Sequence, residues 1–361
     1  MNYGKTGKLY FQYRKLSAPI IKSEFLLVVK SLCLTNCYVS TKAKMDFLLG
    51  NKNRFFKAAI VLVTELSISL FIPTDLIDKV INVFKDYNIV LQTPDYGELS
   101  DVSFGVKVIL NDKMNYENVK GIYRYLENEL RIKHIGERFS FLYSDEEYDK
   151  APHFVLYSTG NSCGAFLKDK GTQFKNNIFC DACGLILQNQ VSPLTIDTSK
   201  IKDGYMVNVG AYWVVSEKMA ELMNNWGITG YELKPVIHKG TVKGKQPAYQ
   251  IIPTNTFPSW SNKMKHYYFA TEEQEQCKDC GIKGRIVGPY IYNQKDLIDA
   301  AKDIYLPQEW THNSKYVYRK TLFSKKFRDL IIENKISRDI RKMSDFKYGS
   351  QDWVFEPILL I

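Results

Sequence analysis

The chain has 361 residues, of which 45% are hydrophobic and 14% aromatic, so it can bury a substantial core and is not intrinsically disordered. Its 49 basic and 39 acidic residues give a formal net charge of +10, which favours acidic partners without indicating nucleic acid. Seven cysteines, an odd number, fit a reducing compartment better than a disulfide framework. No stretch resembles a targeting segment, and we expect a cytoplasmic protein.

The first 50 residues carry eight basic side chains against two acidic ones, Glu24 and Asp46. They could form a basic arm that contacts an acidic partner, and a solvated segment is the simpler interpretation. The most apolar stretch, Phe55–Ile72, is interrupted by Lys57 and Glu65. A membrane-spanning helix would bury these charges at high cost, so we expect buried strands or a core helix there, and no membrane contact.

Residues 1–150 are predicted to form an N-terminal α/β region. A helix is expected to begin at Thr74 as N-cap, because Leu76, Ile77, Val80, Ile81 and Phe84 recur at helical spacing. The other predicted elements are a strand within Ala58–Ile72, a strand over Val102–Leu110, a helix over Asn115–Ile132, and short strands over Phe139–Tyr143 and His153–Tyr157. The acidic segment Asp145–Asp149 between the last two strands is interpreted as a solvated turn or a contact surface.

Two C-x-x-C-G motifs organise the rest of the chain: Cys180, Cys183 and Gly184 form one, and Cys277, Cys280 and Gly281 the other. The spacing lets two thiolates bind one metal ion, and the glycine lets the backbone turn so that its N–H groups face sulfur. Four cysteines are the ligand set of a closed, structural Zn²⁺ site. A gap of 93 residues separates Cys183 from Cys277, so a whole subdomain would lie between the two halves of one zinc ribbon. A disulfide within each pair, a redox-active pair, and thiols without a special role are the alternatives.

An internal repeat follows the two motifs. Each unit is expected to contain a strand, a serine N-cap, an amphipathic helix, and a closing strand with an acidic residue shortly before proline. Ser216 and Ser324 are the predicted caps, and the closing strands carry Glu232 with Pro235 and Glu356 with Pro357. The two halves, residues ~175–240 and ~265–361, could pack pseudo-symmetrically and share the metal ion at their junction.

Together, the two C-x-x-C-G motifs, the capped helices and the proline-containing strands resemble the double-CXXCG-motif family of bacterial proteins. That resemblance covers residues ~150–361 and implies an immunity protein of a polymorphic toxin system, which binds its cognate toxin and blocks it. The first repeat departs slightly from the pattern, because Leu233 and Lys234 separate Glu232 from Pro235. Residues 1–150 match no family that we can name.

Few catalytic motifs are evident in the sequence: it contains no H-E-x-x-H or P-loop pattern, and no G-x-G-x-x-G after a strand. Cys163, between glycines in Gly160–Gly164, is the one conceivable nucleophile, and a nearby His153 could lower the pKa of its thiol. A turn is the simpler interpretation of that segment. We therefore expect a protein that is not an enzyme.

Nucleic-acid binding is the main competing function. The stretch Trp260–Phe269 interleaves aromatic and basic residues, and Lys315–Lys347 is rich in lysine and arginine. The structural alternative is a strand at Tyr267–Phe269 and a solvated basic helix face.

The sequence thus predicts an α+β protein in two parts: the N-terminal α/β region, residues 1–150, and a double-CXXCG region, residues 151–361, with duplicated zinc-knuckle and strand–helix–strand modules. The predicted function is non-enzymatic neutralisation of a toxin, with Cys180, Cys183, Cys277 and Cys280 holding one structural Zn²⁺. The segment between Gly240 and Ser261 and the acidic segment near Asp145 are the candidate toxin-binding surfaces.

Overall fold

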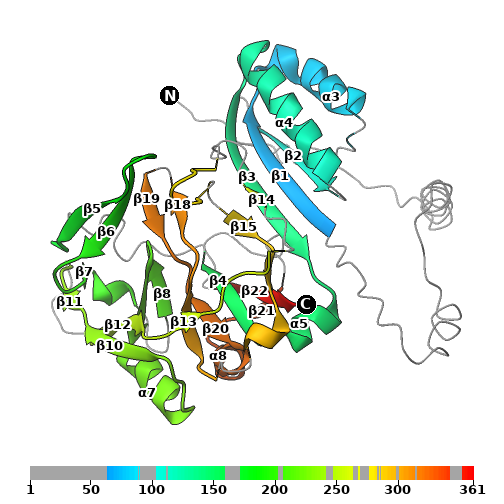
Figure 1. The fold of residues 1–361 in the computed structure, drawn as a ribbon. Coiled ribbons are helices and arrows are strands. Elements are labelled where there is room, and N and C mark those ends of the chain that lie inside the picture. The colour runs from blue at the N-terminus through cyan, green and yellow to red at the C-terminus, as the bar shows by residue number, and fades with distance from the viewer. Residues whose placement is uncertain are drawn as a thin grey trace, which may run out of the picture. The chain divides into compact units, whose positions relative to one another are not determined.

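The computed structural model describes residues 63–87, 89, 103–110, 113–158, 171–201, 206–240, 247–262, 267–268, 276–282, 284, 286–297, 301–313, 315–341 and 352–361. The predictions for the basic N-terminal arm and for Cys163 lie outside these residues. The described part contains both helices and strands, and this confirms the α+β class (Figure 1). Whether the chain divides near residue 150 stays a prediction.

The first sheet has three antiparallel strands in the order β2-β1-β3. Its strands are β1 (Val63–Phe71), β2 (Ser103–Leu110) and β3 (Lys133–Leu142), and its helices are the 3-10 turn η1 (Thr74–Leu76), α3 (Ile77–Asp86) and α4 (Lys113–Asn128). Leu66, Ile68 and Leu70 alternate along β1 and are buried in one cluster with Val80 and Phe84 of α3. The apolar stretch that the sequence assigned to buried structure is therefore a strand over residues 63–71. No helix in the described residues is long and apolar enough to cross a membrane.

Two local predictions in this region are wrong. Thr74 does not cap α3, because η1 precedes the helix and Leu76 occupies the N-cap position without a side-chain bond. The acidic segment is not a turn but the short helix α5 (Asp145–Lys150), which begins with a capping box between Ser144 and Glu147. Its carboxylates are also engaged within the chain, since Arg341 pairs with Asp145 at 2.8 Å and with Asp149 at 3.5 Å.

Two four-stranded antiparallel sheets follow, and they have the same construction. The first has the order β8-β9-β12-β10, and the second contains the order β17-β20-β4-β22. Their strands are β8 (Met206–Val209), β9 (Tyr212–Ser216), β12 (Ala248–Pro253), β10 (Tyr231–Pro235), β17 (Ile304–Pro307), β20 (Leu322–Ser324), β4 (His153–Ser158) and β22 (Trp353–Leu360). The second sheet is extended by β13 (Thr256–Phe257), β16 (Tyr290–Tyr292) and β21 (Asp339–Ile340).

The pairing register shows that these sheets are equivalent position by position. Pro235 pairs with Tyr249 in the first sheet, and Pro357 pairs with Phe154 in the second. The backbone N–H that follows each serine cap donates to a proline carbonyl, Glu217 to Pro247 and Lys325 to Pro152. The strand predicted over His153–Tyr157 is confirmed as β4. Its place in the repeat was not predicted, because β12 follows its helix in the chain whereas β4 precedes its own.

The two capped helices lie in one shared core. They are α7 (Glu217–Asn225) and α8 (Lys325–Glu333). The Ser216 hydroxyl accepts the Met219 N–H at 3.2 Å, and the Ser324 hydroxyl accepts the Phe327 N–H at 3.1 Å, so both predicted caps are confirmed. Met219 and Phe327 are buried in the same cluster as the rings of β9 and β22, and this cluster unites the two halves.

The acidic residues of the two closing strands occupy different positions. Counting back from the paired prolines, Glu356 corresponds to Lys234, and Glu232 corresponds to Val354. Glu232 is exposed, whereas Glu356 is buried and accepts the Tyr143 hydroxyl at 2.8 Å. Burial raises the pKa of Glu356 to about 7.

The predicted toxin-binding loop between Gly240 and Ser261 contains regular structure. It holds β12 and β13, and Ala248, Ile251 and Phe257 in it are buried. These strands pair with β9 and β17, so much of this segment is part of the sheets and does not form a free loop.

The residues that follow the C-caps of α7 and α8 lead to the first testable prediction. Gly227 and Lys335 each follow their helix in the left-handed region, with φ of 60° and 55°. A lysine is strained there where a glycine is not, so we expect Lys335→Gly to raise the free energy of unfolding by roughly 0.5–1 kcal/mol. The matched variant Gly227→Ala should lower it by about 1 kcal/mol. Urea unfolding curves would measure both changes, and a destabilised Lys335→Gly protein would contradict the expectation.

Candidate metal centre

Each C-x-x-C-G motif lies at the tip of a two-stranded antiparallel hairpin. Cys180 ends β5 (Phe174–Cys180), and Cys183 lies in the turn before β6 (Leu185–Gln190). Cys277 and Cys280 lie between β14 (Tyr267–Tyr268) and β15 (Ile286–Gly288), which also pair with each other. β14 confirms the predicted strand entering the second motif at residues 267–268.

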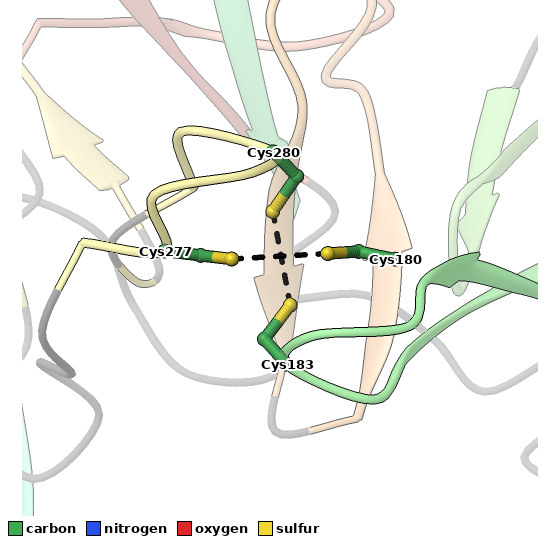
Figure 2. A group of neighbouring side chains, drawn as sticks. All are labelled: Cys180, Cys183, Cys277 and Cys280. Carbon is green, nitrogen blue, oxygen red and sulfur yellow. Dashed lines mark hydrogen bonds between the residues drawn. The ribbon is translucent and has the colours of Figure 1, made fainter.

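The two hairpin tips meet, and their four sulfur atoms converge on one point (Figure 2). Cys180 Sγ lies 3.7 Å from Cys277 Sγ, and Cys183 Sγ lies 3.7 Å from Cys280 Sγ. All four sulfur atoms are within 4.8 Å of one another. Each close pair joins one motif to the other, so the arrangement is one four-cysteine cluster that could hold a metal ion. The cluster contains no histidine or carboxylate from the described residues.

The glycine of each motif makes the turn that brings its second cysteine back beside the first. Gly184 and Gly281 adopt φ of 68° and 73°, a conformation that side chains other than glycine adopt only with strain. The Gly184 N–H donates to the Cys180 carbonyl at 2.9 Å, and the Gly281 N–H donates to the Cys277 carbonyl at 2.8 Å. The two motifs thus have the same backbone structure.

Backbone N–H groups also point at the sulfur atoms. Leu185 donates to Cys183, and Ile282 donates to Cys280 at the matching position of the other motif. The N–H groups of Cys280 and Asp279 face Cys277 and lower the pKa of its thiol to about 7. Desolvation has the opposite effect on Cys183 and raises its pKa to about 12. Donors aimed at sulfur stabilise thiolates, which are the form that binds a metal ion.

A small apolar cluster packs against the cysteine-containing turns. Leu185 and Ile282, each two residues after the second cysteine of its motif, are buried together with Val317. Val317 belongs to β19, which pairs with β6 in a sheet of order β18-β19-β6-β5. The two further strands of this sheet are β18 (Thr311–Asn313) and β19 (Tyr316–Tyr318). The Thr311 hydroxyl bonds the Gly284 carbonyl and the Ile286 N–H, both at 3.1 Å, and so fixes the second hairpin to the same sheet.

His153, the predicted neighbour of Cys163, lies in an aromatic environment. His153 is buried beside the rings of Phe257 and Tyr305, and its Nε2 lies 3.2 Å from the Lys302 carbonyl. Burial lowers the pKa of His153 to about 4. Its predicted partner Cys163 is outside the described residues, so the pairing stays a prediction.

Comparisons with models of protein families, with curated proteins and with solved structures found no match to this chain. The resemblance to the double-CXXCG-motif family therefore rests on the residues quoted for it.

The strained turn generates a second prediction, for which the chain offers a matched control. Gly184 and Gly210 share φ of 68°, and a Cβ at either position would meet no atom within 4 Å. Gly184→Ala should weaken metal binding by about tenfold, because the turn relaxes in the metal-free protein and is strained again on binding. Gly210→Ala, in the turn between β8 and β9, should lower the free energy of unfolding without changing metal affinity. Competition with a chelator would measure the affinities, and equal values for both variants would refute the role of the turn.

Proposed function

We propose that the four cysteines bind one structural Zn²⁺ ion. Zinc coordinated tetrahedrally by thiolates at about 2.3 Å requires sulfur atoms about 3.8 Å apart. The two closest inter-motif distances, both 3.7 Å, fit this geometry. The N–H groups aimed at sulfur and the buried support by Leu185 and Ile282 are the surroundings that such a site uses to orient its ligands.

The proposed ion has a structural role because the protein supplies all four ligands. Catalytic zinc sites leave one position for water or substrate, whereas sites with four cysteine ligands are closed. The bound ion would connect two hairpins whose cysteines are separated by the 93 residues from 184 to 276. β8, β9, α7, β10 and β12 all lie within that interval. Zinc would thus fix the first repeated sheet at both of its chain ends.

Elemental analysis of the reduced, purified protein should find one zinc per chain. Cys180→Ser and Cys277→Ser, one in each motif, should each lose at least about 90% of it, because three ligands hold the ion far more weakly. Removal of zinc from the wild-type protein by a chelator should lower its thermal stability. If either variant kept its zinc, the two motifs would not form one shared site.

On this scaffold we propose a binding function: the protein is an immunity protein that neutralises a cognate bacterial toxin by occluding it. The observation that carries the proposal is the pairing of two C-x-x-C-G motifs with two equivalent serine-capped modules, the pattern on which the family resemblance rests. A zinc site with four cysteine ligands has no position for a substrate, and this agrees with a binding protein that is not an enzyme. A cationic protein would associate rapidly with an acidic toxin surface.

The competing function, nucleic-acid binding, has less support from the described residues. Several basic side chains of the stretch after Lys315 are engaged within the chain, as Arg328 is with Asp339 at 2.6 Å and Arg338 with Asp352 at 2.5 Å. Trp260 is attached to β16, since its Nε1 donates to the Tyr292 hydroxyl at 2.7 Å. The ion pairs leave fewer free charges than the sequence suggested.

Co-expression tests the immunity proposal. The protein should restore growth to cells that express the toxin encoded beside its own gene, and should not protect against an unrelated toxin. The purified pair should co-elute as a complex. Failure to rescue growth, together with retention on heparin that falls steeply as salt rises, would favour nucleic-acid binding instead.

A further inference from the structure

The short helix α5 covers one face of the second sheet through a single aromatic side chain. Tyr148 of α5 is buried, and the centre of its ring lies 5.3 Å from that of Phe154 on β4. The guanidinium carbon of Arg328 on α8 lies 4.7 Å from the centre of the Tyr148 ring. It also lies over the rings of Phe154 and of Phe355 on β22, at 5.5 and 5.9 Å. The surface that holds α5 thus has one residue from each of β4, β22 and α8.

The internal repeat gives each of these three residues an equivalent in the first half. The serine caps align α7 with α8, and the prolines that pair with β12 and β4 align the two sheets. In the order β4, β22 and α8, the equivalents are Tyr249, Leu233 and Ala220. We call these three side chains the α7 face.

The α7 face is partly exposed, whereas the surface that holds α5 is buried. All three of its residues keep contact with solvent, but Phe154 and Phe355 are each 0% exposed. In the chain α5 directly precedes β4. The described residues that precede β12, from 237 to 240 and residue 247, contain no helix. Within the described residues, the first half thus has this surface without the helix that covers it.

The charges beside the two surfaces are opposite. In the second half, the Lys325 ammonium on α8 donates to the Asp149 carbonyl at the end of α5, at 2.8 Å. The equivalent of Lys325 on α7 is Glu217, and Glu221 follows one turn later on the same side of the helix. Both carboxylates are exposed. A segment that lies on the α7 face therefore meets acidic residues where α5 meets a basic one.

The basic residue of α7 does not reverse this sign. Lys218 is the equivalent of Lys326, which donates to the Gly227 carbonyl at 2.6 Å and not to α5. Glu217 and Glu221 also outnumber it. The side of α7 next to the α7 face is therefore acidic, although the chain as a whole carries a net charge of +10.

We propose that the α7 face binds a basic helix of another protein, which places one aromatic side chain against Leu233 and Tyr249. The ring would occupy the position that Tyr148 has in the second half. Ala220 leaves room for it, because a methyl group replaces a long side chain there. Burial of the ring would supply most of the binding free energy. Tyr249 belongs to the segment between Gly240 and Ser261, which the sequence also indicates as a candidate toxin-binding surface.

Charge would select the partner. Basic residues one turn before and after the aromatic residue would pair with Glu217 and Glu221. An acidic helix such as α5 would be repelled from this side of α7. This inference rests on the proposed binding function, in which the partner is the toxin.

Ligand-observed NMR titration of the reduced, full-length protein with peptides tests the proposal. The probe is an alanine-based peptide of about 15 residues, long enough to be helical, with a central tyrosine and lysines one turn before and after it. With a single aromatic anchor it should bind saturably but weakly, with a dissociation constant of about 0.1–1 mM. Alanine in place of the tyrosine, or glutamates in place of the lysines, should weaken binding about tenfold or more.

Two substitutions on α7 separate packing from charge. Ala220→Arg introduces the side chain that the second half has, over Leu233 and Tyr249, and should weaken binding of the basic peptide about tenfold or more. Glu217→Lys introduces the residue that α8 has at this position, and should weaken the basic peptide and strengthen the glutamate peptide. The matched control Glu232→Lys makes the same change of charge on the opposite face of β10, so it should leave both affinities unchanged.

Three results would overturn the proposal: no saturable binding of the basic peptide, equal binding of the glutamate peptide, or unchanged binding to both α7 variants. Self-association of the protein that Ala220→Arg abolishes, without peptide binding, would assign the α7 face to a second copy of the chain and would also overturn it. The peptides contain no toxin sequence. Failure of the growth rescue would therefore leave the peptide results standing, and failure of peptide binding would leave the rescue test standing.

Discussion

The rest of the structure depends on the convergence of four sulfur atoms from two distant hairpins. Thiolates 3.7 Å apart repel each other strongly unless a cation or protons neutralise them. The fold nevertheless brings them together with N–H donors aimed at the sulfur atoms and a buried apolar base. Closing a loop of this length costs chain entropy, and a metal bond to all four sulfur atoms would offset that cost with binding free energy. The cluster therefore links the two chain segments that flank the first repeated sheet.

The fold contains one structural unit twice. Each half has a four-stranded antiparallel sheet, a serine cap, a helix and a proline at the same register position. The two halves share the core that contains the helices, because α7, α8 and the rings of Trp213 and Trp353, whose centroids are 5.1 Å apart, belong to a single cluster. A helix that buries one apolar face needs an opposing surface, and each half supplies that surface to the other.

The sequence revealed those features whose signal is local. The cysteine spacing, the serine caps and the periodicity of α3, α4, α7 and α8 each depend on a few adjacent residues. Strand pairing is not local, and so the role of β4 and β12 as the third strand of each repeat was not visible. The helix in the acidic segment also has a local signal, the capping box of Ser144 and Glu147, which was missed. Its pairing with Arg341, far away in the chain, could not be predicted in this way.

One difference between the halves concerns the closing strand of each sheet. In the first sheet β10 is the edge strand, and Lys234 on it is exposed. In the second sheet β22 pairs with β16 beyond it, and the corresponding Glu356 is buried. A carboxylate covered in this way needs neighbours, and Tyr143, Tyr157 and Lys320 surround it. Tyr290 of β16 belongs to this environment, since its hydroxyl lies 3.2 Å from the Tyr157 hydroxyl. The added strand thus helps to enclose a carboxylate at a position where the first half has an exposed lysine.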